Sequence, residues 1–496
     1  MDLTMLLEMA VSGEPGRVAV GSLADGTSYA ELDRVARRIG ARLAETGSER
    51  VALLDLNSEV TPLLLFGCAA AGLPLAPMSF RLTDEQLAAA AERLAPVTVV
   101  AGADFAHRIA EHPGVTVLPA DELLAHGTAP GAAPDLVPGD PDRAAVLLAT
   151  SGTTGTPKDA VLRHRHLASY IIGSVEFWAA GADEAILVSV PNYHVAGITS
   201  VLSSVYSGRR LVMLPQFSAE AWVETAAREQ VTHAMVVPTM LGRVLDVLEG
   251  TGERLPALRH LSYGGGRMPL PTIERALGLL PHVGFVNAYG LTETSSTIAV
   301  LGPQDHRDAV LSDDPEARLR LGSVGRPLPT LELEIRDADG GVVTDGASGE
   351  VVVRGEQISG EYRTHSVLDA DGWYHTRDRG RLDPGGFLFV EGRVDDVIVR
   401  GGENLSPGEI EDVLLEHPGV VEAAVVGVPD TEWGERVEVA VVRRPDTELS
   451  SEELQEWVRV RLRSAKVPAR VHWREALPYS ETGKLLRRVL VSELSQ

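Results

Sequence analysis

Short runs of consecutive apolar residues alternate with longer amphipathic stretches along the first two thirds of the chain. RVALLDL (50–56), AAVLLAT (144–150) and EAILVSV (184–190) have the length and continuity of strands buried on both faces. Between such runs, residues 29–46 and 83–95 repeat apolar positions at helical spacing. This alternation predicts a large domain of layered α/β sheets with mainly parallel strands.

The pattern changes near residue 322. Short strands broken by turn residues follow, with DADGG (337–341) as a hairpin signal, and they predict a small β-barrel-like part. Beyond EGRVDD (391–396) the pattern predicts a helix, two strands and a second helix, which is α+β. We therefore expect a large N-terminal domain (1–393) and a small C-terminal domain (394–496), which is long enough to fold by itself.

Composition and charge narrow the range of functions. The chain has 496 residues, of which 44% are hydrophobic and 23% charged, as in soluble globular proteins. No apolar run is long enough to span a bilayer, and the N-terminus lacks the basic flank of a secretory signal, so we expect a cytoplasmic protein. The net charge of −25 disfavours nucleic acid and membrane partners. A nucleotide site here would need its own cations, including Mg²⁺.

The single cysteine, Cys68, excludes an internal disulfide framework and a cysteine-rich metal site. It lies in the apolar segment LLLFGCAAAGL, where we expect it to be buried and inert. Any thiol that takes part in the chemistry would then come from outside the chain.

The segment TSGTTGTPK (150–158) follows an apolar strand and is suited to binding phosphate. Glycines let backbone N–H groups approach anionic oxygens, hydroxyls add donors, and the lysine adds a positive charge. It differs from the Walker A loop, because Lys158 follows a proline and residues 159–164 are predicted to be extended, with a helix beginning near His166. The alternative is a plain surface turn. The expected phosphate-binding residues are Thr150, Ser151, Gly152, Thr153, Thr154, Gly155 and Lys158.

Further motifs follow in a characteristic order. They are YGLTE (289–293), WYHTRD (373–378), GRVDD (392–396), GGENLSPGEIE (401–411) and PYSETGK (478–484). From about residue 20 to its end, the chain resembles the adenylate-forming superfamily of acyl- and aryl-CoA synthetases, peptide-synthetase adenylation domains and firefly-type luciferases. The resemblance implies a mobile C-terminal domain. It also implies that ATP activates a carboxylic acid to an acyl-adenylate, whose acyl group passes to the thiol of coenzyme A.

The resemblance assigns roles to the nucleotide-binding residues. Thr292 would hold the α-phosphate, and Glu293 would bind Mg²⁺, which needs only one or two carboxylates beside phosphate oxygens. Asp378 would bind the ribose diol and Arg393 the ribose or a phosphate. Lys484 would stabilise the transition state of adenylation from the small domain. The residues expected around the adenine are Gly264, Gly265, Gly266, Asn287, Ala288, Tyr289 and Gly290, with Tyr289 stacked on the ring.

The acyl pocket and the thiol path also follow from the resemblance. His194 would lie near the substrate carboxylate, although a satisfied core histidine is the alternative. Amino-acid-activating relatives carry an aspartate near this position, and its absence favours an acid without an α-amino group. The expected acyl-pocket residues are His194, Val195, Ile198, Thr239, Met240 and Gly264, which suit an apolar and even bulky group. Gly401 and Gly402 would either line the coenzyme A tunnel or form a simple turn, and Asp395 would be the hinge.

Two residues depart from the family pattern. Asp159 and Arg377 both stand where the family usually has glycine. A carboxylate beside the phosphate loop would repel phosphate unless it points away. Arg377 could either crowd the nucleotide or add a positive charge beside it. Two alternative functions stay open: delivery of the acyl group to a carrier-protein thiol or a partner enzyme, and a relative that no longer adenylates. Neither the acid nor the oligomeric state follows from the sequence.

Overall fold

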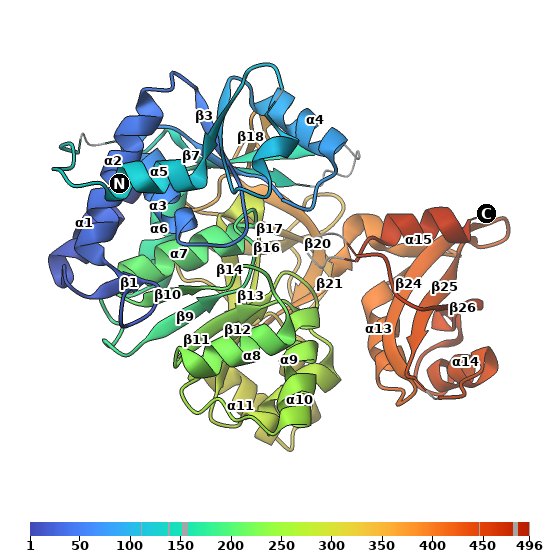
Figure 1. Cartoon of the computed structure of the whole chain (residues 1–496). Coiled ribbons are helices and arrows are strands. Elements are labelled where there is room, and N and C mark those ends of the chain that lie inside the picture. The colour runs from blue at the N-terminus through green and yellow to red at the C-terminus, as the bar shows by residue number, and fades with distance from the viewer. Residues whose placement is uncertain (111, 137–138, 151–156, 446, 480–484, 496) are drawn as a thin grey trace.

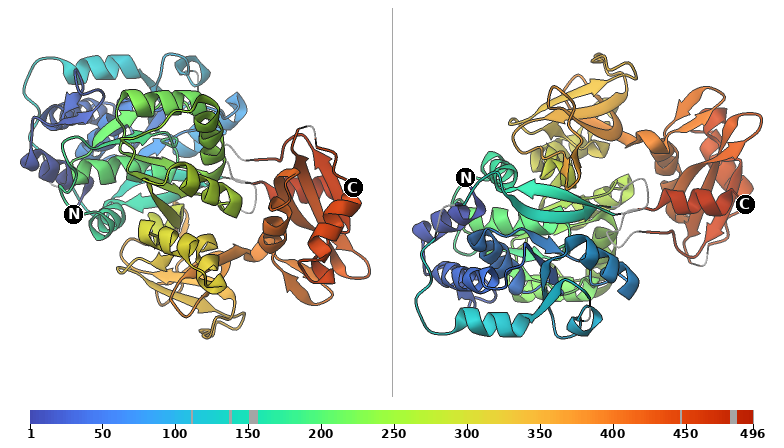
Figure 2. Two further views of the ribbon diagram at one scale, coloured as in Figure 1. Left: turned by 90° about the horizontal axis from the view of Figure 1, so that it is seen from below. Right: turned by 90° about the horizontal axis from the view of Figure 1, so that it is seen from above.

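The computed structural model describes residues 1–110, 112–136, 139–150, 157–445, 447–479 and 485–495. A large N-terminal domain of layered α/β sheets carries a small β part, and a smaller α+β domain follows it (Figure 1). Figure 2 shows this C-terminal domain to one side of the large domain in both views. The predicted fold class is confirmed, while the exact boundary after residue 393 stays a prediction. No helix in the described part of the chain is long and apolar enough to cross a bilayer.

The first large sheet is mainly parallel, with antiparallel strands at both ends. Its strand order is β15 (Arg326–Pro327), β14 (Ser296–Leu301), β13 (Gly284–Leu291), β12 (His260–Gly264), β11 (His233–Val236), β9 (Ala185–Val188), β10 (Arg210–Met213), β1 (Val18–Val20) and β2 (Thr27–Ser28). The parallel strands β9, β11 and β12 are neighbours, so the loops after their carboxyl ends share one edge.

The second large sheet combines a parallel half with an antiparallel half. Its strand order is β19 (His365–Ser366), β18 (Glu361–Tyr362), β8 (Lys158–Arg163), β7 (Ala144–Thr150), β4 (Leu75–Pro77), β3 (Arg50–Leu54), β5 (Val97–Ala101) and β6 (Val115–Pro119). Strand β18 joins this sheet from a segment about 200 residues away, since Tyr362 pairs with Ala160 of β8.

The small β part predicted after residue 322 is an antiparallel sheet of β16 (Glu332–Arg336), β17 (Gly349–Arg354), β20 (Tyr374–Leu382) and β21 (Leu388–Arg393). The C-terminal domain has its own sheet of β23 (Glu403–Leu405), β22 (Ile398–Arg400), β25 (Gly434–Arg443) and β24 (Val420–Asp430), and β26 (Arg470–Arg474) pairs with β25. Its valines and leucines form a separate core with α13 and α14.

The helices form layers around the two large sheets. One hydrophobic core lies between the sheets and includes residues of α1, α2, α3, α6 and α7. The helices of the large domain are α1 (Leu3–Gly13), α2 (Tyr29–Ala44), α3 (Val60–Ala71), α4 (Asp84–Leu94), α5 (Ala120–Thr128), α6 (His164–Ser174), α7 (Val195–Ser207), α8 (Ala219–Arg228), α9 (Pro238–Thr251), α10 (Leu270–Leu279), α11 (Pro303–Leu311) and α12 (Pro315–Leu319). The small domain has α13 (Pro407–Leu415), α14 (Ser451–Arg459) and α15 (Arg487–Leu494). Short 3₁₀ turns are η1 (Ala106–Arg108), η2 (Thr292–Thr294), η3 (Arg320–Gly322), η4 (Val394–Asp396) and η5 (Ser464–Lys466).

The carboxyl edges of the two large sheets meet at the loop between β9 and α7. Asn57, which follows β3, donates its amide to the carbonyl of Val190 at 3.1 Å and accepts from the N–H of Asn192 at 3.0 Å. Phe80, which follows β4, lies 6.0 Å from the Tyr193 ring between centroids. Ligands of α/β proteins bind outside the carboxyl ends of strands, so this junction is the place where the fold presents a site.

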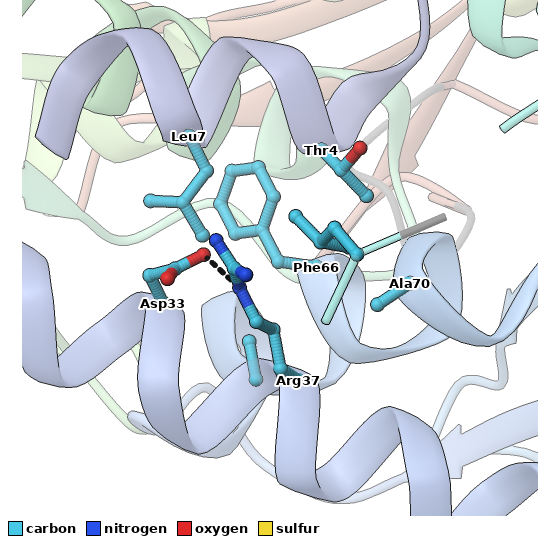
Figure 3. Close-up of a pocket in the computed structure, with 8 residues that line it drawn as sticks. Thr4, Leu7, Asp33, Arg37, Phe66 and Ala70 are labelled. Carbon is cyan, nitrogen blue, oxygen red and sulfur yellow. Dashed lines mark hydrogen bonds and ion pairs between the residues drawn. The ribbon is translucent and has the colours of Figure 1, made fainter. Parts of the chain in front are cut away.

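A cavity between α1, α2 and α3 is unrelated to this junction (Figure 3). Its volume of about 10 Å³ is that of a single water molecule. Asp33 and Arg37 form an ion pair of 2.9 Å at its wall. It is lined by Thr4, Leu7, Asp33, Ala36, Arg37, Phe66, Ala70 and Leu136. A cavity of this size excludes an organic substrate.

Candidate active site

The predicted phosphate loop joins two antiparallel strands. Thr150 is the last residue of β7 and pairs with Lys158, the first residue of β8. The Thr150 hydroxyl donates to the carbonyl of Lys158 at 3.3 Å. Of residues 159–164, which are predicted to be extended, 159–163 lie in β8, whereas His164 is already the first residue of α6 and the predicted helix start near His166 is wrong. Ser151, Gly152, Thr153, Thr154 and Gly155 lie outside the described residues, so their phosphate contacts stay predictions.

Asp159 pairs with arginines on the face of β8 opposite Lys158. Successive side chains of a strand lie on opposite faces, so Asp159 and Lys158 diverge. The Asp159 side chain is 7% exposed, and its carboxylate pairs with Arg93 at 3.1 Å and with Arg363 at 3.4 Å. Two arginines therefore neutralise this acid locally. The Asp159 carboxylate, which replaces the family's glycine, therefore does not neutralise Lys158, and the Lys158 charge stays available for an anion.

Glu293 lies on η2, directly after β13, and is buried. Its carbonyl accepts hydrogen bonds from the N–H groups of Ser359 and Gly360 at 2.9 and 3.0 Å. Its Oε1 accepts one from the Tyr362 hydroxyl at 2.5 Å. Thr292 is the preceding residue of the same turn, so the structure brings the two predicted residues together.

Tyr362 links Glu293 to Lys158. The Lys158 ammonium lies 5.5 Å from the centroid of the Tyr362 ring, within the range of a cation–π contact. Burial and the nearby Glu293 charge raise the pKa of Tyr362, so its hydroxyl stays protonated and donates a hydrogen bond to the carboxylate. The motifs do not include Tyr362, and no local pattern marks it, because its partners lie far away in the chain.

Asp378 is held from two sides. Tyr289 donates its hydroxyl to Oδ2 at 2.6 Å, and Arg393 donates to Oδ1 at 3.2 Å. Asp378 and Arg393 face each other on the paired strands β20 and β21. Burial, followed by the Asp378 charge, raises the pKa of Tyr289 well above its usual value. A carboxylate oxygen accepts more than one hydrogen bond, so these contacts leave Asp378 able to bind a diol.

The glycines of the predicted adenine site allow close backbone contacts. Gly264 pairs with Ala288 of the neighbouring strand, and a Cβ at Gly264 would lie 2.3 Å from the Ala288 carbonyl oxygen. Gly290 is equally constrained, since a Cβ there would lie 1.8 Å from the carbonyl oxygen of Ser296. The structure thus brings Gly264 beside Ala288, whereas Gly265 and Gly266 lie nearest to Val237 and Pro238. The Asn287 amide donates to the Ser323 carbonyl at 3.1 Å, which ties down β13.

The predicted acyl-pocket residues lie at the carboxyl ends of three neighbouring strands. His194 and Val195 follow β9, Thr239 and Met240 follow β11, and Gly264 ends β12. Ile198 is one turn further along α7 and is fully buried in the core between the sheets. The amide of Asn192 and the Nε2 of His194 are buried and have no hydrogen-bond partner among the described residues. Such groups are normally satisfied by water or a ligand.

His194 is a neutral imidazole at physiological pH. Burial, helped by the charge of Arg81, lowers the pKa of His194 to about 4. Its Nε2 can therefore accept or donate a hydrogen bond but brings no positive charge to a carboxylate. The alternative for His194 is a core histidine whose ring nitrogens are hydrogen-bonded within the protein. The unpartnered Nε2 does not support that alternative.

His194 should titrate near pH 4 and not near 6.5. NMR of ¹³C-labelled protein measures the titration, and the resonance of His194 is identified because it disappears in His194→Gln. The pKa of His194 in the folded protein lies below the ordinary value of about 6.5, so the unfolded protein takes up this proton at a higher pH than the folded protein. The stability that the neutral His194 contributes is therefore lost as the pH falls from about 6.5 through 4. A midpoint near 6.5 would contradict the buried, neutral imidazole.

Gly401 and Gly402 form the turn between the antiparallel strands β22 and β23. Their φ angles are +58° and +83°, as two-residue hairpin turns require, so turn geometry alone explains both glycines. The N–H of Gly401 donates to the carbonyl of Trp433 at 2.8 Å. The simple-turn interpretation is sufficient here, and a role in a coenzyme A tunnel stays a prediction.

Arg377 and Asp395 contact each other. Arg377 donates to Asp395 Oδ1 at 2.7 Å, so its guanidinium lies beside the predicted hinge. The Arg377 φ is +61°, a left-handed conformation that costs a residue with a Cβ roughly 1–2 kcal/mol. A second contact links the two domains, because Arg267, next to Gly266, bonds Asp412 of α13. Lys484 lies outside the described residues.

Arg377→Ala should be less stable than Arg377→Gly by about 1 kcal/mol. Both variants lose the ion pair with Asp395, but only glycine relaxes the left-handed backbone. Paired thermal and urea denaturation measures the difference. Equal stability of the two variants would show that the backbone at this position is not strained.

Comparisons with known proteins agree with this geometry, which is that of a two-domain nucleotide-dependent enzyme. The chain matches the family model described as AMP-binding enzyme over residues 7–363, and the model of the AMP-binding enzyme C-terminal domain over residues 409–484. The chain therefore belongs to the AMP-binding enzyme family.

Similar proteins include ligases of fatty acids. The chain is 33% identical to a fatty acid–[acyl-carrier-protein] ligase of Streptomyces coeruleorubidus, over 96% of this chain and 93% of that protein. It is 32% identical to a long-chain-fatty-acid–CoA ligase of Mycobacterium tuberculosis, over 94% and 93%. Among solved structures, o-succinylbenzoate CoA synthetase from Bacillus subtilis, in complex with its acyl-adenylate intermediate, superposes with a TM-score of 0.85 at 28% identity, over 98% and 97% of the two chains.

Proposed function

We propose that the protein activates a carboxylic acid with ATP to an acyl-adenylate and then transfers the acyl group to the thiol of coenzyme A. The observation that carries this proposal is the convergence of Lys158 and Glu293 on Tyr362, together with the Tyr289–Asp378–Arg393 cluster. This arrangement offers a cation for phosphate, a carboxylate for Mg²⁺ and a carboxylate for a ribose diol.

The first step joins two anions. A carboxylate oxygen of the acid attacks the α-phosphorus of ATP, an O–P bond forms, and the bond to the β-phosphate breaks as pyrophosphate leaves. Lys158, Arg393 and Lys484 would offset the negative charge, and Glu293 would hold Mg²⁺, which supplies further neutralisation when bound. Positioning and electrostatics are the main contributions such a site can make.

In the second step the thiol sulfur attacks the acyl carbonyl, a C–S bond forms, and AMP leaves as the C–O bond breaks. The thiol proton passes to the departing phosphate or to solvent. We infer that residues 394–496 turn about Asp395 between the two steps, so that the Gly401–Gly402 turn takes the place of Lys484. The short η4 turn between the sheets of the two domains supports this hinge.

The acid is proposed to lack an α-amino group and to carry an apolar acyl chain. Residues 192–195 contain no aspartate that could pair with an ammonium group, and His194 is itself neutral. Fatty acids and o-succinylbenzoate, the acids named for the similar proteins, have no α-amino group.

Transfer to a carrier-protein thiol is the second candidate, because one similar protein is named a fatty acid–[acyl-carrier-protein] ligase. Incubation with ATP, an acid panel and coenzyme A distinguishes the two functions. An acyl-CoA product supports the first. The second is supported if the acid causes pyrophosphate release but no thioester forms with coenzyme A, and a thioester appears only after a phosphopantetheinylated carrier protein is added. No pyrophosphate release with any acid would contradict both.

Lys484→Ala should lower acid-dependent pyrophosphate exchange by about 100- to 1000-fold, the usual cost of removing a transition-state donor. Thioester formation from synthetic acyl-adenylate and coenzyme A should be retained, because that step does not use the lysine. Lys466→Ala, which removes a small-domain lysine bonded to Glu409, is the matched control and should keep both activities. Equal loss of both half-reactions in Lys484→Ala would contradict the assigned role.

A further inference from the structure

Tyr362 occupies a position between the two charged groups that the proposed reaction needs most. Its hydroxyl donates to Glu293 Oε1 at 2.5 Å, and its ring lies under the Lys158 ammonium at 5.5 Å. One aromatic side chain therefore sets the separation of a phosphate-binding cation from a metal-binding carboxylate. No other side chain bonds the Glu293 carboxylate within the described part of the chain.

We propose that Tyr362 is a positioning residue that orients the Glu293 carboxylate toward the cation accompanying ATP, and that Asp159 fixes the strand carrying Tyr362. This inference rests on the proposed function and extends it to two residues to which the sequence motifs assign no role. Carboxylates that bind a metal are themselves commonly hydrogen-bonded, and loss of such a bond weakens metal affinity or activity by about 10- to 100-fold.

The Tyr362 hydroxyl leaves the carboxylate able to bind a metal. It uses one lone pair of Oε1, and the rest of the carboxylate stays available for a cation. The backbone of Glu293 is also fixed, because its carbonyl accepts from Ser359 and Gly360, which lead directly into β18. Rotation of the side chain is then the remaining freedom, and the tyrosine hydroxyl restricts it.

Strand β18 is a two-residue strand that pairs with β8 at one position and with the equally short β19 at two. Its described span is Glu361–Tyr362, and its register with β8 rests on the pair Tyr362–Ala160. Ion pairs fix it on both sides of the tyrosine. Glu361 forms a two-pronged pair with Arg163, with distances of 2.7 and 2.8 Å. This geometry is the stronger form of an arginine–carboxylate contact.

On the other side of the tyrosine, Arg363 is fixed by Asp159. The Arg363 N–H donates to the carbonyl of Asp159 at 3.1 Å, and its guanidinium pairs with the Asp159 carboxylate at 3.4 Å. Arg93 of α4 completes the cluster at 3.1 Å. Without the Asp159 charge, the partly buried Arg93 and Arg363 would lose the carboxylate that both of them pair with, which is unfavourable. Asp159, the departure from the family's glycine, thus supports the strand on which Tyr362 stands.

The test compares Y362F with Y29F and D159N. Y362F removes only the hydroxyl that contacts Glu293. Y29F is the matched control, because within the described part of the chain the buried Tyr29 hydroxyl bonds backbone carbonyls alone, those of Arg209 at 3.2 Å and Ser204 at 3.5 Å. D159N keeps the shape of the side chain and removes its charge. Each variant is measured for binding of Mn²⁺·ATP by electron paramagnetic resonance, for the Mg²⁺ dependence of pyrophosphate exchange, and for thioester formation from synthetic acyl-adenylate.

Y362F is expected to weaken Mn²⁺·ATP binding and to raise the half-saturating Mg²⁺ concentration by about 10-fold or more, with thioester formation unchanged. D159N should shift both metal readouts in the same direction by less, and Y29F should match the wild type. Wild-type metal dependence in Y362F, or an equal fall of both half-reactions, would overturn the proposal. If Y362F does not fold, unchanged metal binding in D159N would overturn it.

The metal readout also separates this proposal from the proposed function. If wild-type protein adenylates none of the acids tried, the proposed function fails, yet Mn²⁺·ATP binding still reports on Tyr362. If the wild type adenylates an acid and Y362F keeps its metal affinity, the function stands and the role of Tyr362 is wrong.

Discussion

Local neutralisation of charge is the constraint on which the site depends, because two anions must meet inside a chain with a net charge of −25. The buried carboxylates are tied to nearby donors. Asp378 accepts from Tyr289 and Arg393, and Glu293 accepts from Tyr362. Asp159 is enclosed by arginines on the opposite face of its strand. The acidic protein therefore presents its acids already partnered and oriented.

Much of the fold follows from the sequence because buried parallel strands are continuous apolar runs and covering helices are amphipathic. Residues 50–56 contain β3 (Arg50–Leu54), and residues 83–95 contain α4 with Thr83 as its capping residue. The predicted start of α6 near His166 is two residues too late. The His166 ring accepts a hydrogen bond from the Arg163 N–H at 3.4 Å, so the helix begins at His164, directly after the strand.

The site is less predictable than the fold. Motif residues such as Glu293 and Asp378 are recognisable, because their neighbours in the chain are part of the signal. Tyr362 is not, since its hydroxyl partner is 69 residues away and its function depends on strand pairing. The effect of Asp159 likewise depends on Arg93 and Arg363, at separations of 66 and 204 residues. Pairings over such distances leave no periodicity for sequence analysis to detect.

A crystal structure with ATP and Mg²⁺ tests the central claim most directly. The account predicts phosphates beside Lys158, the ribose at Asp378, and the metal on the Glu293 carboxylate with the Tyr362 hydroxyl still bound to it. Nucleotide bound away from these residues, or a metal that does not contact Glu293, would contradict it.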